Sequence, residues 1–176
     1  MTPTTLHETT VFNAEASLND WLRSQIATFA LPAWMGGTVH FITDWPEIEK
    51  SLPCISVAHL PGYRRGEYER GDVSARQMLA RGLVDVSAWV SRSQLYQGQE
   101  VWLPRLRFME GMIEQAHAGA VAIVIRDYLT SLSNPQDTPY RIILGDISVV
   151  QTGPDPNPDI ERRRALINYR WFLRSE

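Results

Sequence analysis

The chain has 176 residues and a mass of 20.0 kDa, which suits one domain that buries its own core. Its 17 basic and 20 acidic residues give a net charge of -3, which argues against a surface built to neutralise many nucleic-acid phosphates. The only cysteine, Cys54, excludes an internal disulfide, and its apolar surroundings predict a buried thiol in a reducing compartment. No apolar run approaches the roughly 20 residues that cross a bilayer, and residues 1–10 lack the features of a signal peptide. We therefore expect a soluble protein that folds in the cytoplasm.

The first part of the chain predicts a tail followed by a helix. Residues 1–13 are rich in threonine and have little to bury, so we expect a flexible N-terminal tail. From Ala14 the apolar residues recur at helical spacing, with Asn13 or Ser17 available as the N-cap and Pro32 beyond the end. The predicted buried stripe of this first amphipathic helix consists of Leu18, Trp21, Leu22, Ile26 and Phe29.

Two short strands are predicted next. The pair Gly36 and Gly37 marks a turn, after which Thr38–Thr43 alternates briefly between apolar and polar residues. Pro53–Leu60 is a stronger strand, since its proline stands at the first position, where the missing backbone donor does little harm.

The segment Pro61–Arg81 has almost nothing to place in a core. Glycines alternate there with charged residues and two tyrosines, and a connection of this length is uncommon in a compact domain unless it is functional or disordered. We interpret it as a long polar arm that orders against another chain, because tyrosine and arginine are favoured at interfaces. The candidate subunit or tube interface residues in the arm are Tyr63, Arg64, Arg65, Tyr68 and Arg70.

The middle of the chain predicts a strand, a helix and another strand. Gly82–Arg92 alternates as a half-buried strand does. Gln97–Gly119 holds a second amphipathic helix that begins near Trp102 and ends at Gly119, because Pro104 is tolerated only in a first turn. The β-branched run Val121–Arg126 predicts a central strand, and a turn-rich loop follows it.

The C-terminal part predicts a β-hairpin. Tyr140–Val150 reads as a strand with a bulge at Gly145, and three prolines in residues 154–158 confine the next segment to a surface turn. From Glu161 the apolar positions alternate with mostly cationic ones, which include Arg162 and Arg164. We predict that these two arginines form ion pairs with carboxylates of a neighbouring subunit, with an anion site as the less favoured alternative.

The order of these elements predicts an α+β fold. We expect a mixed, mainly antiparallel sheet of about five strands, with two amphipathic helices packed on one face and the long polar arm beside it. Residues 14–176 would form this single domain.

The usual signatures of enzymes are absent from the sequence. It has no glycine-rich phosphate loop, no paired-cysteine motif and no nucleophile elbow. The four histidines are scattered, and the acidic group Asp44, Glu47 and Glu49 is typical of a solvated loop, although it could hold a cation. We therefore expect no catalytic, cofactor or metal site. The six tryptophans, several of them near the ends of elements, favour either an interface or a filled core.

This layout resembles the tail terminator (tail completion) proteins of long-tailed bacteriophages. The resemblance covers about Ala14–Leu173: a first helix, strands flanking a long polar loop, a second long helix and a C-terminal hairpin whose last strand is apolar and basic. It implies a structural virion protein at the junction of tail and neck, assembled in the host cytoplasm. Such proteins form a ring, commonly a homohexamer, that caps the tail tube, ends its polymerisation and offers a docking surface to the head connector. DNA would pass through the lumen without specific binding.

Other functions remain open from the sequence. A head-tail connector or stopper in the neck is the nearest alternative. A small cytoplasmic enzyme would have to use an unrecognised site, for which His40, Asp44 and His59 are weak candidates. A nucleic-acid binding module would depend on the C-terminal arginines.

Overall fold

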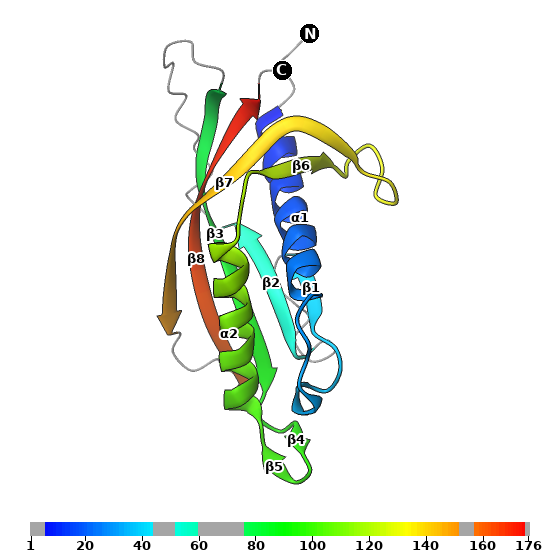
Figure 1. Ribbon diagram of the computed structural model, residues 1–176, viewed down its shortest axis with the longest axis vertical. Helices are drawn as coiled ribbons and strands as arrows, with labels where there is room; N and C mark the ends of the chain where they lie inside the picture. The colour runs from blue at the N-terminus through cyan, green and yellow to red at the C-terminus, as the bar shows by residue number, and fades with distance from the viewer. Residues whose placement is uncertain (1–5, 44–51, 60–75, 152–156, 175–176) are drawn as a thin grey trace.

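The computed structural model describes residues 6–43, 52–59, 76–151 and 157–174 (Figure 1). They form two long helices, a six-stranded sheet, a small hairpin and one 3-10 turn, with no helix among them long and apolar enough to cross a membrane. The helices are α1 (Leu6–Ile26) and α2 (Trp102–Ala118), and the 3-10 turn is η1 (Ala33–Met35). The strands are β1 (His40–Thr43), β2 (Cys54–His59), β3 (Arg76–Ser91), β4 (Leu95–Tyr96), β5 (Gln99–Glu100), β6 (Ile123–Asp127), β7 (Gln136–Gln151) and β8 (Ile160–Arg174).

The main sheet has the strand order β1-β2-β3-β8-β7-β6, and β4 pairs with β5 apart from it. Only β1 and β2 are parallel; every other pair is antiparallel. The sheet curls, and the hairpin of β6 and β7 arches across the N-terminal part of α1 (Figure 1). The prediction of an α+β fold with a mixed, mainly antiparallel sheet and two helices is therefore confirmed, with six strands in place of about five.

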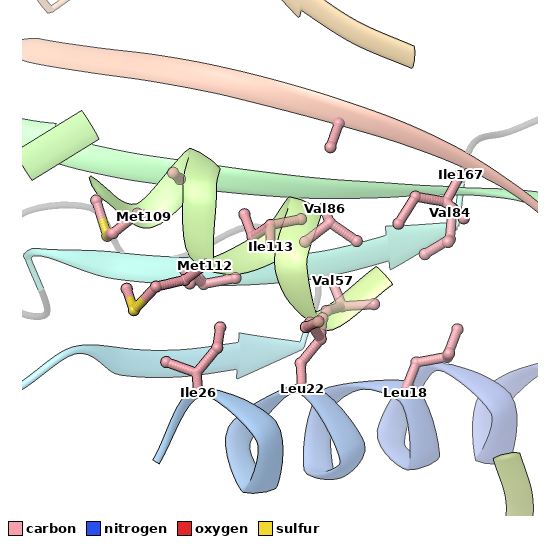
Figure 2. Close-up of a cluster of buried hydrophobic side chains, with 14 of the residues drawn as sticks. Leu18, Leu22, Ile26, Val57, Val84, Val86, Met109, Met112, Ile113 and Ile167 are labelled. Carbon is pink, nitrogen blue, oxygen red and sulfur yellow. The ribbon is translucent and has the colours of Figure 1, made fainter. Parts of the chain in front are cut away.

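Both helices bury their apolar stripes against the same face of the sheet. Leu18, Leu22 and Ile26 of α1 point toward the sheet, and Met109, Met112 and Ile113 of α2 meet the same core (Figure 2). All six side chains are buried, as the three-four spacing of the sequence predicts. The strands contribute Ile55, Val57, Val84, Val86, Ala88, Val90, Ala165, Ile167 and Tyr169.

Three predicted boundaries are wrong. The first helix begins at Leu6 and not near Ala14, so residues 6–13 are helical and not a tail. Threonine and valine lower helix propensity by only a few tenths of a kcal/mol each, and extending an existing helix avoids the cost of nucleation. Ser17 is no N-cap, since its Oγ accepts a hydrogen bond from the Arg126 backbone N–H (2.9 Å) and so joins α1 to β6. The expected arm is also shorter: Arg76–Arg81 belongs to β3, and residues 60–75 lie outside the described part.

Two strands have different surroundings from those expected. Between Gly82 and Ser91, β3 is buried on both faces, so the prediction of a half-buried strand is wrong. The β6 strand is at the end of the sheet order and not central. Its apolar character has another cause, since Ile123 and Ile125 belong to the core that α1 covers.

Local irregularities mostly match the sequence. The pairing of β7 with β8 shifts register between Leu144 and Ile147, which confirms the bulge expected at Gly145. Gly119 ends α2 and donates its backbone N–H to the Gln115 carbonyl (3.2 Å). The β4–β5 hairpin was not expected, although Gln97 and Gly98 carry the two positive φ angles that a tight hairpin turn requires.

One glycine permits a close side-chain approach within the sheet. Gly82 of β3 lies opposite Tyr169 of β8, and a Cβ atom at Gly82 would be 2.4 Å from the Tyr169 ring. We predict that Gly82→Ala lowers the free energy of unfolding by about 2 kcal/mol, since a well-packed site must shift to admit a methyl group. Gly111→Ala is the matched control: nothing lies within 4 Å of its added Cβ, and the exposed helical site should gain about 0.5–1 kcal/mol. Urea denaturation of both variants measures the change in the free energy of unfolding. Equal changes in the two variants would contradict a close contact between Gly82 and Tyr169.

A carboxylate joins the end of β3 to the start of β8. Asp159 Oδ2 accepts hydrogen bonds from the Oγ atoms of Ser91 (2.7 Å) and Ser93 (3.0 Å), and its Oδ1 accepts from the Ser93 backbone N–H (2.8 Å). These hydrogen bonds, led by that of Ser91, hold the pKa of Asp159 below its ordinary value of 3.8.

The ionised form of Asp159 is therefore favoured by folding, and its contribution is lost as pH falls through the lowered pKa. We predict that Asp159→Asn lowers the melting temperature at pH 7 and that the difference from the original protein narrows below pH 3.8. Thermal melts followed by circular dichroism across this range check the prediction. A difference that stays constant with pH would mean that the charge of Asp159 is irrelevant to stability.

Candidate functional site

A polar cluster lies on the face of the sheet that is turned away from the helices. Because side chains alternate along a strand, the core residues Val84, Val86 and Ala88 place Asp85, Ser87 and Trp89 on the opposite face. The register of β3 and β8 sets Arg164 across from Ser87 and Arg162 across from Trp89. Five residues far apart in sequence are thus brought together.

Two arginines share the carboxylate of Asp85. The Arg162 guanidinium donates through Nη2 to Asp85 Oδ2 (2.8 Å) and through Nε to Ser87 Oγ (3.0 Å). Arg164 donates to the same Oδ2 from Nε (2.8 Å) and Nη2 (2.7 Å). Ser87 Oγ donates to the other carboxylate oxygen (2.5 Å). The Asp85 side chain is 1% exposed, and those of Arg162 and Arg164 are 13% and 25% exposed. We call these four residues the Asp85 cluster.

Trp89 extends this layer toward β2. The Arg162 guanidinium lies over the indole ring with its carbon 4.4 Å from the centroid, a cation–π arrangement. The indole N–H donates to Ser56 Oγ (2.9 Å), and the ring packs with Cys54 and Ile160 in a second small core. Burial raises the pKa of the Cys54 thiol to about 12, so this cysteine is a protonated, inert side chain at neutral pH.

The Asp85 cluster carries an excess of one positive charge, since two guanidiniums face a single carboxylate. A buried carboxylate with donors on both oxygens holds its partners in fixed positions, and breaking such a group costs far more than an exposed pair. The cluster therefore fixes β8 against β3. Arg164, one quarter exposed, is the member that could also meet an external anion or a partner's carboxylate.

The sequence analysis predicted seven interface residues, of which two can be placed. Arg162 and Arg164 are brought together on β8, where both bind the carboxylate of Asp85 in their own chain. Their place at an interface stays a prediction. The alternation of the sequence put both arginines on one face but could not identify their partner, because Asp85 is 77 positions from Arg162. The other five lie outside the described residues: Tyr63, Arg64, Arg65, Tyr68 and Arg70.

The remaining candidates do not assemble into a site. His40 is exposed on β1, whereas the Nε2 atom of His117 is 2.7 Å from the Gly145 carbonyl oxygen. The acidic group Asp44, Glu47 and Glu49 lies outside the described residues. Within residues 6–43, 52–59, 76–151 and 157–174, no three His, Cys, Asp or Glu residues are grouped so that they could hold a metal ion.

The sequence analysis missed an open strand edge. β6 pairs with β7 only as far as Ile142, so in the part of the chain that the structure describes, Ile143–Gln151 has a strand neighbour on the β8 side alone. We call this stretch the open β7 edge. Its consecutive residues Val149 and Val150 are 38% and 36% exposed although they point to opposite faces. Its apolar composition is typical of an interior strand, and only the pairing of β7 with its neighbouring strands shows that this stretch lies at an edge.

A groove runs along β1, at the other end of the strand order. It has a volume of about 540 Å³ and lies between the C-terminal end of α1 and the strand. We call it the β1 groove, and its lining is mostly apolar. The Arg23 guanidinium stands at the groove, with its carbon 5.8 Å from the centroid of the Phe41 ring. The groove is lined by Arg23, Ile26, Ala27, Phe29, Leu31 and Gly37–Ile42.

The Asp85 cluster yields a prediction about stability. Asp85→Asn leaves two guanidiniums against a neutral amide in a mostly buried layer, so we expect a loss of about 3 kcal/mol in the free energy of unfolding. Asp137→Asn is the matched control, because it breaks an exposed ion pair between Asp137 and Arg126. The Asp137 side chain is 67% exposed and that of Arg126 is 45% exposed, and such a pair contributes about 0–1 kcal/mol to stability. Urea denaturation separates the two, and similar losses would show that the cluster does not hold β3 to β8.

No protein-family model matches the chain, and a search of curated proteins finds no significant match.

Proposed function

We propose that the protein is a non-enzymatic structural subunit of a bacteriophage tail, which forms a ring that caps the tail tube and ends its polymerisation. The observation that carries the proposal is the layout: two amphipathic helices on one face of a mainly antiparallel sheet that closes with a long C-terminal hairpin. This is the arrangement on which the resemblance to tail terminator proteins rests. The other face of the ring would receive the head connector.

The physical requirements of a ring support this proposal. A head-to-tail ring needs two different surfaces on each subunit, separated by a fixed rotation. The open β7 edge and the β1 groove are two such surfaces, since they belong to opposite ends of one sheet. The Asp85 cluster and the shared core hold that sheet rigid, so the rotation from one subunit to the next is defined by the fold.

The negative net charge suits a channel for DNA. A chain with -3 overall gives a ring of six copies a total of -18, which does not attract the phosphate backbone. The positive charges of Arg162 and Arg164 are partly neutralised by Asp85. DNA could therefore slide through the lumen without being held.

The proposal predicts the mass of the particle in solution. We expect mass photometry to find a closed ring of about six subunits, or a monomer that becomes one when tail tubes are added, with rings at one end of each tube by negative-stain microscopy. Tubes assembled from a purified bacteriophage tail-tube protein are the substrate. Capped tubes should stop growing, so the tube length distribution is a second readout.

Different outcomes separate the alternatives. A ring that binds a head-connector protein but leaves tubes growing would assign the protein to the neck as a connector or stopper. A monomer that ignores tubes would overturn the proposal. Bovine serum albumin at the same concentration is the control for nonspecific shortening of tubes.

A further inference from the structure

The open β7 edge has the properties of a strand that pairs with another chain. Apart from the Gly145 carbonyl oxygen, which lies 2.7 Å from His117 Nε2, its backbone has a strand partner on one side only among the described residues, and such edges pair readily with other strands unless charge or proline blocks them. Residues 143–151 contain no proline, and Asp146 is their only charged residue. At its end, Val149 and Val150 expose large apolar side chains where most strands of the sheet bury theirs.

The β1 groove has the complementary properties. β1 stands at the end of the sheet and pairs, among the described residues, only with β2. Beside its free edge lie apolar side chains, among them Phe29 and Leu31 from the segment that follows α1 and Phe41 of β1 itself. A strand added there would gain backbone hydrogen bonds from β1 and bury apolar side chains in the groove.

The charges of the two surfaces also match. Arg23 at the groove is 56% exposed and lies 3.8 Å from Asp20, the outer limit of an ion pair. Asp146 on the open β7 edge is exposed, and the structure gives it no ion pair within the described residues. One surface thus offers a cation and the other a carboxylate, beside apolar groups on both.

We infer that the open β7 edge of one copy of this chain docks in the β1 groove of the next copy and continues the sheet from subunit to subunit. Because the two surfaces stand at opposite ends of the strand order, the contact is head-to-tail, and its repetition either closes a ring or forms a filament. The inference rests on the proposed function for the closure into a ring; the contact itself rests on the edge, the groove and their charges.

A charge exchange tests the contact. Asp146→Arg and Arg23→Glu should each raise the dissociation constant of self-association about five- to tenfold, and the double variant Asp146→Arg/Arg23→Glu should return to within about threefold of the original chain. Glu100→Arg makes the same charge change at an exposed position of β5, which lines neither surface, and should leave the constant unchanged. Sedimentation equilibrium at low salt measures all four, and thermal melts confirm that each variant is folded.

Disulfide crosslinking between engineered cysteines tests the same contact without weakening the assembly. We expect a mixture of His40→Cys and Val150→Cys chains to form covalent dimers under mild oxidation. A mixture of His40→Cys and Glu100→Cys should form few, because Glu100 is exposed on β5 and lines neither surface. The native Cys54 is buried, so its contribution to this crosslinking is small.

The outcomes distinguish this contact from the proposed function. If the ring persists in Asp146→Arg and Arg23→Glu and the His40–Val150 crosslink does not form, the proposed contact is wrong. The proposed ring would then be unaffected. Self-association by this contact in a protein that ignores tail tubes supports the contact and overturns the terminator function. If the variants lose tube binding but self-associate as before, the β1 groove does not bind a second copy of this chain. That result would assign the groove to a tube subunit.

Discussion

The antiparallel pairing of β3 with β8 is the constraint on which the other elements depend. It runs from Arg76 to Ser91 on one strand and from Ile160 to Arg174 on the other, and it joins the two halves of the chain. On one face it supplies the apolar residues against which both helices pack. On the other face it brings Asp85 within reach of Arg162 and Arg164. A slip of one residue would exchange the two faces and place arginines under the helices.

The Asp85 cluster gives a physical reason why that register is unique. Hydrophobic alternation alone penalises a one-residue slip, but it tolerates a slip of two, which keeps the same faces. A buried carboxylate opposes both slips, because a displaced Asp85 would leave the positions in which Arg162 and Arg164 both donate to its Oδ2, whereas Ser87 is on the same strand and moves with it. The cluster thus specifies one pairing, and that pairing fixes both the open β7 edge and the β1 groove in relation to the core.

The edges of the sheet, and not a catalytic constellation, support the proposed function. A sheet that ends in an unpaired, apolar strand must be paired, covered or exposed to aggregation. Here one end of the sheet carries the open β7 edge and the other carries the β1 groove, and their charges are opposite. The proposed head-to-tail contact would satisfy both ends at once, and it supports the proposed ring at the end of a tail tube.

Periodicity and turn residues are local properties, so the chain predicted the fold class, the position of α2, the bulge at Gly145 and most of the buried stripes, although Trp21 and Phe29 are only half-buried. It also predicted that Arg162 and Arg164 share one face of a strand. Only the tertiary structure decided that their carboxylate is Asp85, that β3 is buried on both faces and that β6 lies at the edge. The physical reason is that partner, burial and edge position depend on which distant segments pair, and no local pattern records that choice.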